Sequence, residues 1–244
     1  MQNLKINTGF EEIILLGNNV YNGHDFFINA NALLKDVEVL FFFDSRGISK
    51  NWETSLIKML LEYFHTSKYL AVVRPLELTT WATLYNFLHQ NRIDPDLIIT
   101  NVGIVDCTPK KYLHCQSMVE QIIFSSEGLT TTIQPLEEYK MSNGEMEMLF
   151  TLNYSELYKL QLKNFFSTVP LFAIKTPLVD PNITIDRKRP LSFFTQLHKT
   201  NELIDLIVCK SIDLGFFDNQ LTYDAVHWTQ EGNKFVFDKI VNQI

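Results

Sequence analysis

Short apolar runs alternate with segments of helical periodicity from residue 37 onward, and this alternation constrains the fold more than any other feature of the sequence. Continuous apolar runs of five to seven residues are typical of strands that are covered on both faces. The segments between them carry apolar residues every three or four positions, which predicts amphipathic helices. Strand, helix and strand at this spacing indicate right-handed βαβ units and a parallel sheet. The first three strands are expected at residues 37–43, 69–73 and 94–102, with helices at 52–63 and 81–88 between them.

The later part of the chain continues the pattern with longer interruptions. Two more strands are expected at residues 170–180 and 212–218, and helices at 155–166, 192–210 and near the end of the chain around Phe237 and Ile240. We expect residues 37–244 to form one α/β domain with a mainly parallel sheet of about five strands. Residues 108–169 are expected to be an insertion or cap beside the sheet, with a polar loop at 137–147. Residues 1–36 are expected to be a small N-terminal β extension.

Net charge and cysteine content limit the kinds of partner and the cellular compartment that we expect. The net charge is −7 and Lys and Arg form no long run, which argues against nucleic acid or an anionic membrane surface as the main partner. No stretch approaches the roughly 20 apolar residues that span a bilayer, and the first residues do not resemble a secretory signal. Three cysteines without C-x-x-C spacing are typical of reduced thiols in a cytoplasm. We therefore expect a cytoplasmic protein with a small-molecule ligand and no metal.

Three polar segments are expected to meet at one edge of the sheet. They are FDSRG (43–47), NVGIVDCTP (101–109) and YDAVHWTQEG (223–232), of which the first two directly follow predicted strands. In open parallel sheets, ligands bind at the carboxyl ends of the strands, near the point where the strand order reverses. The convergence of these segments predicts a functional site there.

Ser45, His227 and Asp224 are the candidate catalytic residues. Asp224 and His227 are three positions apart, so a helical turn places both side chains on one face. A carboxylate can then hold the Nδ1 proton of the imidazole, which leaves Nε2 free to activate a serine hydroxyl. The alternative is structural: Ser45 would be a turn or N-cap hydroxyl, and Asp224 would cap the helix that begins after His227.

These segments resemble the sequence blocks of the SGNH, or GDSL-type, hydrolase family. Asp44-Ser45 resembles the Asp-Ser of its first block, and residues 224–232 closely resemble its last block, an Asp-x-x-His followed by Thr and Gly. Gly103 and Asp106 resemble the ends of its Gly-x-Asn-Asp block. The resemblance covers about residues 37–244 and implies a flavodoxin-like three-layer α/β/α sandwich that carries a Ser-His-Asp triad.

The departures from the family pattern fall on the oxyanion hole. Val105 stands where the family has an asparagine whose amide stabilises the oxyanion, and neither Leu76 nor Glu77 is the expected second-block glycine. Asn101 is either a substitute donor or a solvent-facing strand residue. Arg46 either meets an anionic group of the substrate or is a surface arginine. Asp106 is expected to cap the following helix or to order its loop.

The resemblance implies a serine esterase without a cofactor. We expect it to remove or transfer a small acyl group, such as acetyl, from a carbohydrate or related metabolite, because water and an acceptor hydroxyl compete for the same acyl-enzyme. The alternative is a non-catalytic ligand-binding protein on the same fold, which the altered oxyanion block favours. A test for an activated serine distinguishes the esterase from the binding protein, because only the esterase needs one.

Overall fold

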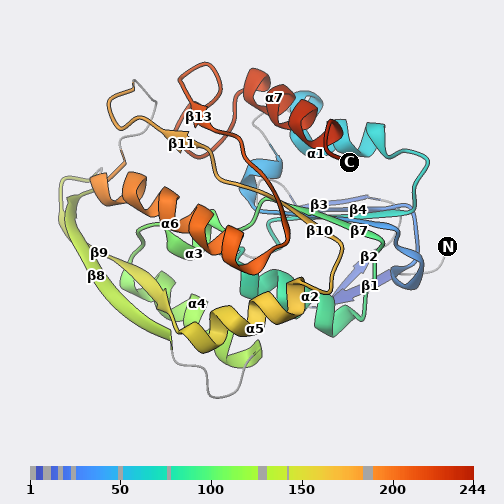
Figure 1. Ribbon diagram of the computed structural model, residues 1–244, viewed down its shortest axis with the longest axis horizontal. Coiled ribbons are helices and arrows are strands. Elements are labelled where there is room, and N and C mark those ends of the chain that lie inside the picture. The colour runs from blue at the N-terminus through green and yellow to red at the C-terminus, as the bar shows by residue number, and fades with distance from the viewer. Residues whose placement is uncertain are drawn as a thin grey trace.

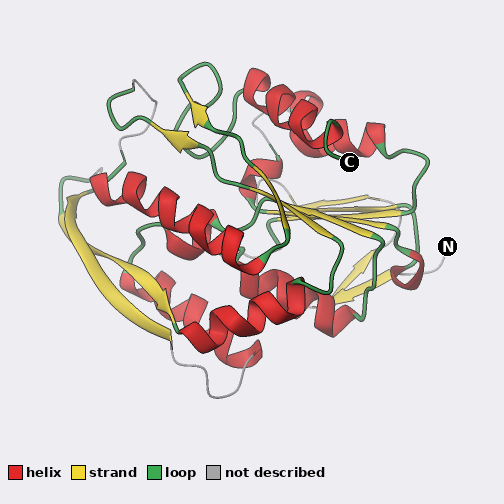
Figure 2. Ribbon diagram, in the orientation of Figure 1, coloured by secondary structure: helices red, strands yellow, loops and turns green. Residues whose placement is uncertain are grey.

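The computed structural model describes residues 4–7, 12–15, 19–22, 26–48, 52–75, 78–125, 131–141, 143–183 and 189–244. A central sheet is covered by helices on both faces (Figure 1). Helices α1 (Leu56–Tyr63) and α7 (Gln230–Val241) lie on one side of it, and α2 (Trp81–Asn91), α4 (Tyr112–Ser125) and α5 (Glu156–Phe166) on the other. The fold is therefore the three-layer α/β arrangement that was predicted, as the colouring by element in Figure 2 shows.

Five parallel strands form the middle of the sheet. They are β5 (Val39–Phe43), β6 (Tyr69–Val73), β7 (Leu97–Thr100), β10 (Leu171–Ile174) and β12 (Lys210–Ile212). Their spatial order is β6-β5-β7-β10-β12. If these five strands are numbered along the chain, this order is 2-1-3-4-5, as in flavodoxin. The strand order reverses between β5 and β7, so a ligand site is expected beyond the carboxyl ends of these two strands.

Two antiparallel strands of the N-terminal extension enlarge this sheet to seven strands. β4 (Phe26–Ala30) pairs with β6, and β3 (Asn19–Asn22) pairs with β4. Ile28 of β4 is fully buried, so this strand is packed as part of the core. β1 (Leu4–Asn7) and β2 (Glu12–Leu15) form a separate hairpin.

Strand β5 shows why its apolar run is unbroken. Residues 40–43 are all fully buried, yet alternate side chains enter different cores. Leu40 and Phe42 join a cluster with residues of α2, α4 and α5, whereas Phe41 and Phe43 join one with residues of α1 and α7. A strand with a core on each face needs apolar residues at every position.

Side-chain caps fix where several helices begin. The hydroxyls of Ser55, Thr80, Ser155 and Thr229 each accept a backbone N–H from the first turn of α1, α2, α5 and α7. Such caps satisfy N–H groups that have no partner within the helix. The other helices of the described residues are α3 (Ile104–Cys107) and α6 (Leu191–Ile207). Short 3₁₀ turns cover Leu34–Asp36, Ser45–Gly47 and Trp52–Thr54.

The prediction of a polar loop at residues 137–147 is wrong. These residues belong to a long antiparallel hairpin of β8 (Thr131–Lys140) and β9 (Met146–Tyr154). β8 has no buried residue, so its composition is that of an exposed segment, and only β9 carries buried apolar side chains such as Leu149 and Leu152. Each of the last two predicted strands is also divided, because β11 (Leu178–Val179) and β13 (Phe216–Phe217) pair with each other beyond β10 and β12.

Candidate active site

Ser45 is the first residue of the 3₁₀ turn that follows β5. Asp44 caps this turn by accepting the backbone N–H of Arg46, at 2.9 Å. Gly47 closes it in contact with the strand, since a Cβ there would come within 2.7 Å of the Phe43 Cβ. Because of this tight turn, Ser45 is partly exposed although the last four residues of the preceding strand are fully buried.

Arg46 is neither of the two things expected from the sequence. It is 1% exposed, so it is not a surface arginine, and its guanidinium is occupied by protein groups. Nε lies 3.0 Å from both carboxylate oxygens of Asp44, and Nη2 lies 2.7 Å from Oδ2. The pair satisfies the planar guanidinium and the carboxylate together, which is the arrangement that makes a buried charge tolerable.

The same guanidinium joins segments that are far apart in the chain. Nη1 donates to the Thr176 hydroxyl after β10, at 3.1 Å, and Nη2 also donates to the Asn101 carbonyl after β7. Its Cζ lies 5.6 Å from the ring centre of Trp228, close enough for a cation–π contact. Arg46 thus ties the ends of three parallel strands to the segment that carries His227.

The turn from Asp224 to His227 is held by the Asp224 side chain. Oδ1 accepts the backbone N–H groups of Val226, at 3.0 Å, and of His227, at 2.7 Å. Ala225 between them has φ +64°, in the left-handed region that non-glycine residues rarely adopt. The carboxylate therefore stabilises a turn that the backbone alone disfavours.

Ser45, His227 and Asp224 form a continuous chain of hydrogen bonds. Ser45 Oγ lies 3.0 Å from His227 Nε2, and His227 Nδ1 lies 2.9 Å from Asp224 Oδ2. Burial would raise the pKa of Asp224, but the hydrogen bonds and charge of His227, together with the Arg189 cation, outweigh it and hold the pKa below its usual value. A permanently ionised Asp224 can fix the tautomer of His227 and leave Nε2 to accept the Ser45 proton.

Thr229 and Gly232 fix the start of α7 after His227. The Thr229 hydroxyl accepts the Gly232 N–H at 3.0 Å, which starts α7. A Cβ at Gly232 would lie 2.1 Å from the Leu221 carbonyl oxygen, so only glycine fits there. The Leu221 carbonyl in turn accepts the Thr229 N–H. The Thr and Gly of the last block thus serve the turn that presents His227.

Asn101 does not face solvent, contrary to one of the two expectations. Its side chain is fully buried, and Oδ1 accepts the backbone N–H of Asp44 at 2.8 Å. Among the described residues, its Nδ2 has no hydrogen-bond partner. The amide oxygen therefore fixes the start of the Ser45 turn, and the role of its Nδ2 as a substitute oxyanion donor stays a prediction.

Gly103, Val105 and Asp106 lie around the short helix α3. Gly103 has φ +132°, a conformation that favours glycine, and a Cβ there would make tight contacts of 3.2 Å with the Trp81 and Ile204 side chains. Val105 is partly buried and packs against both apolar clusters. A valine at this position donates no hydrogen bond.

Asp106 orders its surroundings, but it does not cap the helix that follows it. Its carboxylate accepts the N–H of Trp81, the first residue of α2, at 3.3 Å, and the Tyr154 hydroxyl at 2.9 Å. Burial raises its pKa to about 7, even though these hydrogen bonds oppose the rise. Asp106 thus connects the helix before β7 with the end of the β8–β9 hairpin.

The backbone N–H of Ser45 donates to none of the described residues. An N–H beside the nucleophile is the usual first donor of an oxyanion hole. Leu76 and Glu77, where a second backbone donor was expected, lie outside the described residues.

No sequence motif singles out Arg189. It precedes α6 and forms two hydrogen bonds with Asp224. Nε donates to the Asp224 backbone carbonyl, at 2.9 Å, and Nη2 donates to Asp224 Oδ2, at 3.0 Å. The partners are 35 residues apart and belong to no spacing motif. Tyr223 was also missed, and its ring stacks on that of His227 at 5.8 Å.

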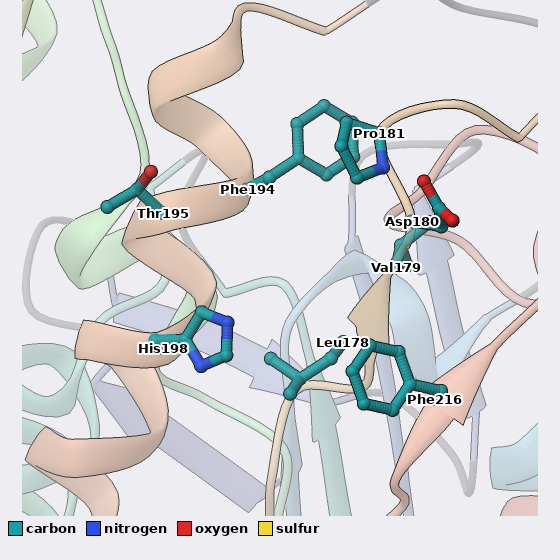
Figure 3. Close-up of a pocket in the computed structure, with 8 residues that line it drawn as sticks. All are labelled: Leu178, Val179, Asp180, Pro181, Phe194, Thr195, His198 and Phe216. Carbon is teal, nitrogen blue, oxygen red and sulfur yellow. The ribbon is translucent and has the colours of Figure 1, made fainter.

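A cavity of about 460 Å³ lies beside α6, between the helix and strands β11 and β13 (Figure 3). His198 of α6 points toward Leu178 across it, and Phe194 of the same helix points toward Pro181. None of Ser45, His227 and Asp224 lines it. In the described part of the chain, no three His, Cys, Asp or Glu side chains are grouped to bind a metal ion, and no helix has the length and apolar character needed to cross a membrane.

Comparisons with known proteins yield only distant structural likenesses. No protein-family profile matches the chain, and no curated protein sequence matches it significantly. The crystal structure of an acetyl xylan esterase is similar over 85% of this chain and 100% of its own, with 16% identity and a TM-score of 0.47. The esterase domain of a protein from Rhodothermus marinus is similar over 99% of this chain and 96% of its own, with 11% identity and a TM-score of 0.39. The function is therefore argued from the residues of the site.

Proposed function

We propose that this protein is a serine hydrolase that cleaves a carboxylic ester through Ser45, His227 and Asp224. One observation carries the proposal: the unbroken chain from Ser45 Oγ to His227 Nε2 and from His227 Nδ1 to Asp224 Oδ2, at 3.0 Å and 2.9 Å. A serine needs a base within hydrogen-bond reach to become nucleophilic, and a base that acts in both directions needs a fixed tautomer. A turn serine needs neither.

In this mechanism Ser45 Oγ attacks the ester carbonyl carbon while His227 Nε2 accepts the hydroxyl proton. His227 then protonates the departing alcohol as the acyl-enzyme forms. Water, deprotonated by the same imidazole, attacks the acyl-enzyme and releases the carboxylic acid, and an acceptor alcohol in place of water gives acyl transfer. Asp224 stays ionised throughout and stabilises the imidazolium.

The oxyanion hole of this proposal has Ser45 N–H as its first donor. A single oxyanion donor typically contributes about 10²–10³ in kcat, so a hole that lacks the amide expected at position 105 should work slowly. Asn101 acts by holding the Asp44 N–H, which fixes the turn on which this donor lies.

The strand order and the three segments support an SGNH-type hydrolase, although the oxyanion block differs from the family pattern. With that type comes the expected substrate, a small acyl group such as acetyl on a carbohydrate or related metabolite. The competing function is a binding protein that retains the fold, and the apolar Val105 is the observation that favours it.

Labelling with a fluorophosphonate probe tests the proposal, because the probe bonds only to an activated serine. We expect one probe per chain on Ser45 in the wild type and none in Ser45→Ala. A matched control is Ser55→Ala, which removes another buried hydroxyl that caps α1 and should leave labelling intact. Ligand binding without any labelling of Ser45 would support the binding protein instead.

A further inference from the structure

Arg189 makes the most specific contact with the proposed triad from outside it. Nη2 and the His227 Nδ1 share one oxygen of Asp224, Oδ2, at 3.0 Å and 2.9 Å. The other oxygen, Oδ1, accepts the two backbone N–H groups of the turn. Four donors thus surround the carboxylate, and it has no freedom to rotate away from His227.

The approach of Arg189 is itself fixed. Its Nε donates to the Asp224 carbonyl, so the guanidinium holds both the backbone and the side chain of one residue. Its Cζ lies 5.3 Å from the ring centre of Phe193 in the first turn of α6. The Arg189 and Asp224 side chains are only 13% and 11% exposed, so solvent and salt screen the pair weakly.

We propose that Arg189 is a positioning residue of the triad: it orients the Asp224 carboxylate toward His227 and, by neutralising part of its charge, sets the basicity of the imidazole. The inference rests on the proposed function for its catalytic consequence, but the contact with Asp224 has a consequence of its own. A carboxylate that faces only His227 stabilises the imidazolium more than one that is shared with a guanidinium.

Removal of Arg189 should therefore raise the pKa of His227. His227 contacts Asp224 at Nδ1 and Ser45 at Nε2, and the ring of Tyr223 stacks on the imidazole. Arg189 is paired with the same Asp224 oxygen that faces His227. Only the Arg189 charge is lost in Arg189→Met, a variant of similar length. The acid limb of Ser45 labelling should move upward by about 1 pH unit, and the plateau rate should fall by about 10–100-fold as the triad loosens.

The experiment measures fluorophosphonate labelling of Ser45 against pH in the wild type, Arg189→Met and Arg189→Lys. Lysine keeps the positive charge but lacks the planar guanidinium that bonds both the Asp224 carbonyl and Oδ2. Compared with Arg189→Met, Arg189→Lys should therefore restore the position of the acid limb more fully than the plateau rate. Lys163→Met removes one positive charge from an exposed site on α5 and should change neither.

A second measurement keeps this inference separate from the proposed function. The six histidines are titrated by NMR, with the His227 signal identified by its absence in His227→Gln. A higher His227 pKa in Arg189→Met supports the inference even if the wild type is not labelled, in which case the hydrolase proposal alone fails. An unchanged His227 pKa in a folded Arg189→Met protein overturns it. Where the wild type is labelled, an Arg189→Met profile that coincides with the wild-type profile overturns it as well.

Discussion

Arg46 and Asp44 form a buried ion pair on either side of Ser45 in the chain, with 2.7 Å between Nη2 and Oδ2 and side chains that are 0% and 3% exposed. The pair lies at the reversal of strand order, and through it the nucleophile's turn is attached to the strands β7 and β10. The position of Ser45 is thus coupled to the core of the sheet.

Arg46→Met should lower the free energy of unfolding by about 3–5 kcal/mol, because it leaves the Asp44 carboxylate buried without its counter-ion. Urea denaturation monitored by circular dichroism measures this. Lys234→Met breaks an exposed pair with Asp238 on α7 and serves as the control, with a much smaller change expected. Equal losses from both variants would contradict a special role for the buried pair.

Ser45→Ala and His227→Ala should each remove nearly all esterase activity, and the double variant should be hardly worse than either. In a serine protease, loss of the nucleophile or the base costs on the order of 10⁶ in kcat, with strong non-additivity. Asp224→Asn should do less damage. The measurement is kcat for hydrolysis of an aryl acetate, and effects of the two alanine changes that multiply would show that the residues do not act as one unit.

Val105→Asn should raise kcat on a small acetyl ester by up to about 100-fold if the amide reaches the oxyanion. The gain depends on neighbouring groups that hold the new side chain, because Val105 packs between the two cores. Val105→Leu is the control, because leucine has a shape similar to that of asparagine but no hydrogen-bond donor, and this variant should show no increase in kcat. Fast wild-type turnover that Val105→Asn leaves unchanged would mean that the hole already has its full set of donors.

Asp106 should make the protein less stable as the pH rises from about 4 to about 7. Its pKa is raised from 3.8 to about 7 in the folded protein, so between these values the folded state binds more protons than the unfolded one. The corresponding loss in the free energy of unfolding is roughly 4 kcal/mol. Asp106→Asn should flatten this dependence in urea titrations between pH 4.5 and 7.5.

Asp224 does not obscure that measurement. Its pKa is lowered, so its contribution to stability is present above the unfolded value of 3.8 and is lost only at lower pH. A slope that is identical in the wild type and Asp106→Asn would show that another group carries the pH dependence.

The sequence predicts the sheet and the meeting of its segments because both follow from local patterns. The run that forms β5 is apolar at every position, which only a strand between two cores requires. Once the strands are parallel, their carboxyl ends share one edge, so Ser45 and the segment around His227 come together although 182 residues separate them.

The parts that the sequence does not predict depend on long-range surroundings. A single arginine such as Arg46 is usually exposed, and its burial follows from partners on β7 and after β10 that no spacing links to it. Arg189 and Asp224 pair across 35 residues for the same reason. The sequence does not predict the β8–β9 hairpin because β8 has no buried residue, and its apolar residues Ile133, Leu136 and Tyr139 are three positions apart rather than two.

The antiparallel strands β3 and β4 also determine which strand borders solvent. Without β4, the apolar strand β6 would present its row of N–H and C=O groups as a free edge, the usual starting point for aggregation through edge-to-edge pairing. At the opposite edge, β12 is only three residues long and begins with the exposed Lys210, two features that discourage such pairing. A chain that starts at residue 37 would therefore keep every residue of the proposed triad and still be prone to aggregate.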